Sequence, residues 1–445
     1  MSAVDNTHRS DPRGRRSVAR PRGVVYAFSA EPGKGSEPGG GWSVVKALAE
    51  AADLTVLVKS EHIDAIRGWE ARHVRPGLRF VEVRPPVPSP LQKAHRITEF
   101  VTYLLWLRAA ERMATDLHLE RPFEFAYHAT YSVYWLPTPA TRMGIPSIWG
   151  PVGGGVAAPR TVLGFLGISG LFDEALDRMA VAAAALWPGT RRSWREASVR
   201  IVQNEDTLAR LPAGLRSETH VLNAGELTEV ARPPVRGRQP VVVFPSALIS
   251  RKCPRLALEA IVHAPGVRLQ FAHGGPQEAM LRRLARRLGV ANRVDFLGKI
   301  PRGELFERVA GASAALFTGV REEGGLALAE ALSMGTPVVV LSVGGARTLC
   351  HAAPDSSRVA LVDPYDSRGP SVALGAAIHR FVQSPVPEDG PNLDAGVASQ
   401  RLVALVGRAL GRDLAPPEGA PGSPPKTIQD RPPLDPLATA TGGDR

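Results

Sequence analysis

Residues 318–341 restrict the possible folds of this chain more than any other stretch. They read TGVREEGGLALAEALSMGTPVVVL, an acidic loop, a glycine pair, an apolar helical run, a Gly-Thr-Pro turn and a run of valines. We expect a helix to begin at about Gly325 and a buried strand to follow the turn. Because the first N–H groups of a helix are free and lie at the positive end of its dipole, this loop–helix–strand unit predicts an anion-binding site.

Two glutamates of this stretch are candidates for ligand contacts. Glu330 lies in the apolar run LALAEALSM, where burying a carboxylate is costly unless a partner satisfies its lone pairs. A ribose diol is one such partner, and Glu322 on the preceding loop would then reach another part of the same ligand. The alternative, a solvated loop glutamate and a surface helix glutamate, is commoner for an isolated pair. The glycine pair and the following strand favour the ligand-binding interpretation.

The pattern E-x-G-G-x-x-x-x-E followed by A-L-x-x-G-x-P-V-V resembles the donor-site signature of family 4 glycosyltransferases, which are retaining enzymes with the two-domain GT-B fold. Gly324 stands where that family usually has phenylalanine. The resemblance implies that Glu322 touches the donor sugar or its phosphate and that Glu330 holds the ribose of a nucleotide sugar. It also implies that Gly324, Gly325 and Leu326 belong to the donor site.

A cationic pair precedes a helix earlier in the same half of the chain. Arg251 and Lys252 are in a position to meet a diphosphate, although a solvated surface pair is the alternative. The family pattern G-R-L-x-x-x-K-G supplies an arginine and a lysine to the pyrophosphate. Lys252 matches the lysine, whereas Ala247 stands in place of the arginine. Either Arg251 substitutes from its own position, or the phosphate clamp is weaker than usual.

Apolar strand-like runs alternate with helix-sized intervals along the chain, which is what doubly wound α/β domains require. We therefore predict two Rossmann-like domains facing each other across a cleft. The expected order is a disordered basic arm (1–22), an acceptor-side domain (23–226), a Pro- and Arg-rich linker (227–240), a nucleotide-sugar-binding domain (241–397), a helix crossing back to the first domain (398–413) and a disordered Pro-rich tail (414–445).

The first strand, expected at 24–30, leads into EPGKGSEPGGGW. Its spacing is not G-x-G-x-x-G, so a dinucleotide site is disfavoured. We interpret the stretch as a loop in which Gly40 and Gly41 leave room for a pyrophosphate and an incoming hydroxyl at a helix start, with a flexible turn as the alternative. The motif G-S-E-P-G-x-G-W is also similar to that of a subgroup of the same glycosyltransferase family.

Two further features of the first domain follow strands, where ligands collect in open α/β sheets. His128 follows a strand at 123–127, and the resemblance implies that it faces the acceptor; a satisfied, buried histidine is the alternative. A second strand ends in GPVGGG, whose glycines suggest close approach of the backbone to a ligand, and Gly153 and Gly154 are assigned to the acceptor side. The apolar helical stretch 161–189 is expected to pack internally, although related enzymes use such segments in an acceptor groove or on a membrane.

Composition excludes several classes of function. No run of about 20 apolar residues predicts a membrane span, and Cys253 and Cys350 give neither a metal-site spacing nor a disulfide framework. The net charge of +11 favours anionic partners, but no nucleic-acid-binding motif accompanies it. We therefore expect no metal, no cofactor and no nucleic-acid partner. We expect a cytoplasmic location, with contact to the inner face of a membrane left open.

Together these features predict a metal-independent hexosyltransferase that moves a sugar from a nucleoside diphosphate sugar to a carbohydrate, lipid-linked or small-molecule acceptor hydroxyl. The expected catalytic residues are His128, Glu322, Arg251 and Lys252, with positive charge stabilising the departing diphosphate. An epimerase that uses water in place of an acceptor is one alternative. A non-catalytic nucleotide-sugar-binding protein is another, because Ala247 and Thr348 depart from the family pattern.

Overall fold

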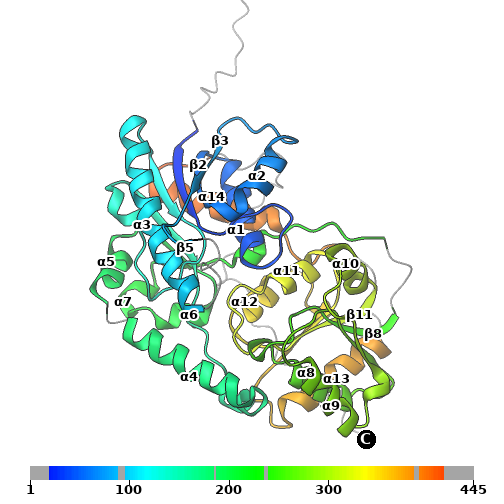
Figure 1. Ribbon diagram of the computed structural model, residues 1–445. Helices are drawn as coiled ribbons and strands as arrows, with labels where there is room; N and C mark the ends of the chain where they lie inside the picture. Colours follow the sequence, from blue (N-terminus) through cyan, green and yellow to red (C-terminus); the bar gives the residue numbers. More distant parts are fainter. Residues whose placement is uncertain (1–19, 89–95, 185–186, 235–238, 385–389, 415–445) are drawn as a thin grey trace, which may run out of the picture.

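A computed structural model describes residues 20–88, 96–184, 187–234, 239–384 and 390–414 (Figure 1). The chain forms two α/β domains, each built on a parallel β-sheet with helices on its faces. The predicted basic arm and Pro-rich tail lie almost wholly outside the described residues. The predicted linker is described only in part, and the second domain begins at Gln239.

The first domain contains a seven-stranded sheet in the order β3-β2-β1-β4-β5-β6-β7. Its strands are β1 (Arg22–Ala27), β2 (Asp53–Lys59), β3 (Leu78–Val83), β4 (Phe125–His128), β5 (Ser147–Val152), β6 (Val199–Val202) and β7 (Thr219–Val221). Its helices are α1 (Ser36–Ala49), α2 (Ile63–Glu70), α3 (Arg96–Glu120), α4 (Gly167–Ala184), α5 (Pro188–Glu196), α6 (Glu205–Arg210) and α7 (Ala213–Arg216). The strand order reverses beside β1, so this sheet has a switch point there.

The second domain contains a six-stranded sheet in the order β10-β9-β8-β11-β12-β13. Its strands are β8 (Gln239–Phe244), β9 (Arg268–Phe271), β10 (Val294–Phe296), β11 (Ala312–Phe317), β12 (Val338–Leu341) and β13 (Val359–Val362). Its helices are α8 (Pro254–Val262), α9 (Glu278–Arg287), α10 (Arg302–Gly311), α11 (Leu326–Ser333), α12 (Gly344–Ala352) and α13 (Pro370–Gln383). Its order reverses between β8 and β11, and both of these strands lead into the candidate site.

The last helix, α14 (Ala395–Leu410), returns to the first domain. Its buried residues Leu402 and Val406 share a core with Val25 of β1 and Leu48 of α1. Arg401 fixes the helix further, because its guanidinium pairs with Glu226 at 2.9 Å. The first domain is therefore completed by residues from the end of the described chain.

The glycine-rich stretch after β1 becomes helical at Ser36, so the prediction that Gly40 and Gly41 lie in a loop is wrong. Because α1 begins at Ser36, the N–H groups of Gly40 and Gly41 fall inside the helix and not among its free first donors. Gly41 instead allows close packing, since a Cβ there would lie 2.2 Å from the backbone oxygen of Ser29. This geometry does not support the donor-binding role predicted for Gly40 and Gly41.

The connection between β5 and α4 crosses to the second domain. Val156, Ala158, Val162 and Leu166 lie in one buried cluster with residues of β8, α8 and β9. Part of the range assigned to the acceptor-side domain therefore supplies core to the other domain. The stretch expected as one helical segment is divided into a 3₁₀ turn at Arg160–Phe165, then α4 and α5.

Candidate active site

The end of β11 fixes the turn that carries the cationic pair. The hydroxyl of Thr318 donates to the backbone oxygens of Lys252 and Cys253, at 3.0 and 2.9 Å. The N–H of Val320 donates to the backbone oxygen of Arg251 at 3.0 Å. Lys252 ends a 3₁₀ turn. Cys253, the next residue, has a φ of +49°, a value that residues other than glycine rarely adopt.

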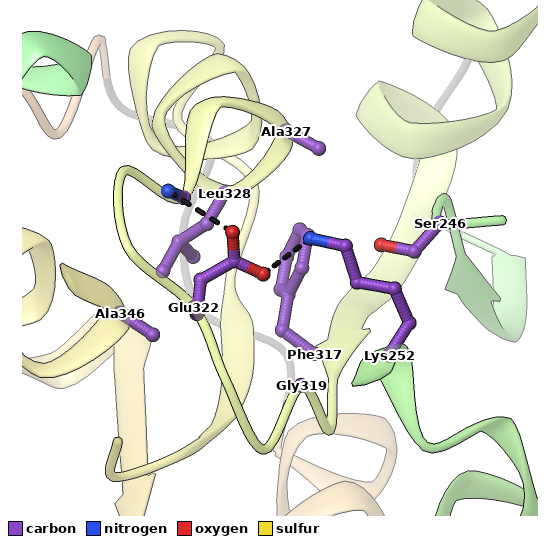
Figure 2. Close-up of a pocket in the computed structure, with 9 residues that line it drawn as sticks. Ser246, Lys252, Phe317, Gly319, Glu322, Ala327, Leu328 and Ala346 are labelled. Atoms are coloured by element: carbon purple, nitrogen blue, oxygen red, sulfur yellow. Dashed lines mark hydrogen bonds and ion pairs between the residues drawn. The ribbon is translucent and has the colours of Figure 1, made fainter. Parts of the chain in front are cut away.

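Lys252 and Glu322 face each other in a pocket of the second domain (Figure 2). The ammonium of Lys252 pairs with one carboxylate oxygen of Glu322. The other oxygen accepts the N–H of Gly325 at 3.1 Å, at the start of α11. The lining residues are Ser246, Lys252, Phe317, Gly319, Glu322, Gly325, Ala327, Leu328 and Ala346. The structure thus brings together the cation, the loop carboxylate and the helix start that the sequence predicted.

The glycine pair shapes the start of α11. Gly325 has a φ of +60°, and a Cβ there would lie 2.8 Å from the side chain of Leu349. A side chain is therefore excluded both by backbone conformation and by space. Gly324 lies at the domain interface, where its oxygen would be 3.0 Å from a Cβ on Gly225. Leu326 also reaches the other domain and lies against Gly39 of α1.

Glu330 lies farther along α11 and is only 6% exposed. Its carboxylate accepts a hydrogen bond from the guanidinium of Arg302 at 2.7 Å. Burial raises the pKa of Glu330, and Arg302 opposes that rise. Gly35, on the loop after β1, lies against this ion pair, since a Cβ there would be 2.6 Å from Arg302. Glu330 is not among the residues that line the Lys252–Glu322 pocket, and sequence reasoning missed its arginine partner.

Two of the departures from the family pattern, Ala247 and Thr348, lie in different surroundings. Ala247 follows β8 and does not line the pocket, and neither does the exposed Arg251. Thr348 on α12 is buried and donates its hydroxyl to Glu205 of the first domain at 2.6 Å. Thr348 therefore links the two domains.

His128 lies at the end of β4, as predicted, but its ring is only 1% exposed. Its Nε2 lies 3.2 Å from the Tyr103 hydroxyl and its Nδ1 lies 3.0 Å from the Thr138 hydroxyl. Burial lowers the pKa of His128 from 6.5 to about 3. This geometry does not support the predicted contact with an acceptor, because both ring nitrogens are engaged inside the domain. It matches the alternative of a satisfied core histidine.

The glycines after β5 approach a carboxylate of the protein itself. Glu323 accepts the N–H of Val156 at 3.2 Å, and a Cβ on Gly153 would lie 3.1 Å from it. Burial raises the pKa of Glu323, and hydrogen bonds from Gly154, Asn204 and Val156 oppose that rise. Gly153 and Gly154 therefore lie beside the loop that carries Glu322 and Glu323. The sequence analysis gives no role to Glu323.

A second group that the sequence reasoning missed lies on the first domain near the start of α1. Glu37 accepts the N–H of Tyr131 at 2.9 Å, and the Tyr131 hydroxyl donates to Glu99 at 2.9 Å. Ser36 and Tyr131 have φ values of +58° and +54°. Such conformations in residues other than glycine persist only where surrounding contacts enforce them, and they concentrate at functional sites. Ser36 and Glu37 belong to the motif G-S-E-P, whereas the sequence analysis assigns a role only to glycines that follow this motif.

Sequence comparisons concern mainly the second domain. Residues 228–367 match the family model described as Glycosyl transferases group 1. The D-inositol 3-phosphate glycosyltransferase of Mycolicibacterium smegmatis is 37% identical over 134 residues, covering 29% of this chain and 30% of that protein. The protein of the same name from Mycobacteroides abscessus is 30% identical over 192 residues, covering 41% and 42%. This chain thus matches less than half the length of these curated relatives.

Structure comparisons cover both domains. Sucrose-phosphate synthase from Thermosynechococcus elongatus aligns with a TM-score of 0.55 at 17% identity, over 88% of this chain and 100% of that one. The apo form of the lipopolysaccharide outer core galactosyltransferase WaaB aligns with a TM-score of 0.51 at 13% identity, over 86% and 94%. The chain has the GT-B fold. The predicted fold class is confirmed, and the GT-B fold together with the family match supports a glycosyltransferase family.

The described residues of this GT-B chain lack two further features. None of the helices they form is long and apolar enough to cross a bilayer. Among the same residues, no group of three or more His, Cys, Asp or Glu side chains could hold a metal ion.

Proposed function

We propose that this protein transfers a sugar from a nucleoside diphosphate sugar to an acceptor hydroxyl. The observation that carries the proposal is the pocket in which Lys252, Glu322 and the start of α11 meet, within the part of the chain that matches the glycosyltransferase family. In this reaction the bond from the anomeric carbon to the diphosphate breaks. A bond to the acceptor oxygen forms, and the acceptor hydroxyl loses its proton.

The main electrostatic demand of the reaction is on the leaving group, because the diphosphate gains negative charge as the anomeric carbon becomes cationic. Lys252 and the positive end of α11 would stabilise that charge. Since these interactions strengthen as the bond breaks, they lower the barrier as well as the dissociation constant. Glu322, now paired with Lys252, would release it to the diphosphate and accept sugar hydroxyls. Arg251, which does not line the pocket, is the candidate that the sequence offers for the arginine that Ala247 replaces.

The nucleoside end of the donor would lie toward Glu330. A ribose diol would share that carboxylate with Arg302, where the loop after β1 also meets the second domain. Retention of anomeric configuration and independence from metal are part of the proposal. Retention comes from the resemblance, and metal independence from the cationic side chain that would neutralise the diphosphate.

The acceptor would lie on the first domain beside Glu37 and Tyr131. Two relatives are named for D-inositol 3-phosphate, an anionic acceptor, but they match this chain over less than half of it. Glu37 and Glu99 bring two carboxyl groups to Tyr131. Burial raises the pKa of Glu37, and the hydrogen bond from the Tyr131 N–H opposes that rise. We therefore propose a neutral or amine-bearing polyhydroxy acceptor, because carboxylates repel a phosphate and attract an amine.

The test begins with thermal shift against UDP-, GDP- and ADP-hexoses, because a ligand that binds the folded state raises its apparent stability. The donor that binds is then incubated with myo-inositol, an aminocyclitol and myo-inositol 1-phosphate, and glycoside formation is followed by mass spectrometry. Transfer is the expected result. Release of an epimerised free sugar without acceptor would favour the epimerase, and binding without any turnover would favour a non-catalytic protein.

A further inference from the structure

Helix α4 lies at the edge of the molecule (Figure 1). Five large apolar side chains on it are between 41% and 90% exposed, namely Ile168, Leu171, Phe172, Leu176 and Met179. They recur at intervals of three or four residues, so they lie along one side of the helix. We call these five residues the α4 face. Internal packing, which the sequence favoured, is therefore wrong for them.

Other polar residues of α4 fix it to the protein, although Asp173 and Arg178 are exposed. Glu174 is buried and accepts the N–H of Ala158 at 3.2 Å. Arg321, on the loop that carries Glu322, pairs with Asp177, and its guanidinium lies 3.4 Å from the carboxylate of Glu174. This arrangement is the reverse of an ordinary surface helix. The ion pairs and the buried carboxylate fix the rotation of α4, so its apolar side stays exposed.

Positive charge flanks the α4 face at both ends. The exposed Arg160 precedes the helix, and Trp187, which is 56% exposed, follows it. The next helix, α5, carries exposed arginines at 191, 192 and 195, and Glu196 pairs with Arg192. The packing of Val181 of α4 in one cluster with Trp194 of α5 places the two helices together. An apolar stripe that ends at an exposed tryptophan and arginines suits the boundary between lipid headgroups and acyl chains.

We propose that the α4 face docks this protein on an anionic membrane surface. The five apolar side chains would enter the headgroup boundary, and the flanking arginines would meet lipid phosphates. The net charge of +11 on the chain favours the same partner. A second copy of the chain fits less well, because the exposed arginines favour an anionic partner over another copy of a chain with a net charge of +11.

Docking through α4 would hold the donor site near the surface. Arg321, which anchors α4, is adjacent in sequence to Glu322 of the donor pocket, and its guanidinium donates to the backbone oxygen of Val156 at 3.2 Å. Gly170 of α4 lies against Ser250 on the turn that carries Lys252, since a Cβ on Gly170 would be 2.9 Å from Ser250. The membrane-facing helix thus contacts the loop before Glu322 and the turn before Lys252.

The experiment is co-sedimentation of the full chain with vesicles of phosphatidylcholine, alone or mixed with phosphatidylglycerol. We expect binding to the mixed vesicles that weakens as salt is added. The double variant Phe172→Ser/Leu176→Ser should bind at least about tenfold more weakly, because two apolar side chains no longer leave water. The control Leu119→Ser/Val262→Ser removes exposed apolar side chains elsewhere and should bind as the parent does.

A second pair of variants tests the charges. Arg191→Glu/Arg195→Glu should lose binding to anionic vesicles, whereas Arg283→Glu/Arg286→Glu on α9 should not. Circular dichroism and the donor-induced thermal shift should stay unchanged in all four variants, which separates lost docking from lost folding. The proposal is overturned if the parent protein binds neither kind of vesicle, or if Phe172→Ser/Leu176→Ser binds as tightly as the parent. It is also overturned if sedimentation instead reveals a dimer that Phe172→Ser/Leu176→Ser dissociates.

Discussion

The candidate residues of the two domains differ in how far apart they lie in the sequence. On the second domain, Glu322, Gly325 and Glu330 lie within nine residues, and only Lys252 comes from a distant turn. On the first domain, Glu37, Glu99 and Tyr131 come from three separate segments. The family match likewise covers 228–367 and leaves the first domain outside. The proposed donor site, made mainly from one local motif, can therefore be found by pattern, whereas the proposed acceptor side, assembled by tertiary contacts, cannot.

The largest effect should come from Lys252→Ala. Loss of the cation that faces the diphosphate should lower kcat by about 10²–10³, the size seen when one preorganised electrostatic contact is removed. Single-turnover kinetics measure it. Arg287→Ala on α9 is the matched control, because its side chain is exposed outside the pocket, and it should leave kcat unchanged. An equal loss in Arg287→Ala would show that the effect of Lys252→Ala does not come from the pocket.

Glu330→Ala should weaken donor binding by about 10–150-fold, the equivalent of about 1.5–3 kcal/mol for hydrogen bonds to a charged group. Isothermal titration with the donor measures the dissociation constant. Glu307→Ala, an exposed glutamate on α10, serves as the control. An unchanged dissociation constant in Glu330→Ala would mean that this carboxylate serves only to hold Arg302.

His128 tests the first domain through pH. Its folded-state pKa of about 3 lies below the ordinary 6.5, so the unfolded chain binds the proton first as pH falls. Stability should therefore drop as pH falls from 6.5 toward 3, by about 2 kcal/mol at about pH 5 from this residue alone. Urea unfolding across this range should give a shallower pH dependence for His128→Asn. Identical slopes for parent and variant would contradict a buried neutral imidazole.

The smallest effect is expected at Glu37, whose loss should act only on the acceptor. Glu37→Gln should raise the acceptor KM about fivefold, near 1 kcal/mol, and leave the donor dissociation constant unchanged. Glu50→Gln, at the other end of α1, is the control. A change in donor binding with no change in acceptor KM would remove Glu37 from the acceptor side.

Sequence alone predicted the fold class and the meeting of Lys252 with Glu322, because strand alternation and one motif are local properties. It failed where contacts between distant segments decide the outcome. The glycines after Ser36 lie inside a helix, where Ser29 and Thr130 leave no room for a side chain at Gly41, and no local pattern records those neighbours. Arg302 is 28 residues from Glu330, and neither segment contains a pattern that predicts their ion pair.

The return of α14 to the first domain has a consequence for biosynthesis. Residues 239–384 form a contiguous sheet domain and can assemble as soon as they leave the ribosome. The core of the amino-terminal sheet, although most of it is made earlier, is covered in part by Leu402 and Val406. The half of the protein that is translated first is therefore completed last, and a nascent chain that ends before residue 395 lacks the side chains that cover this part of the core.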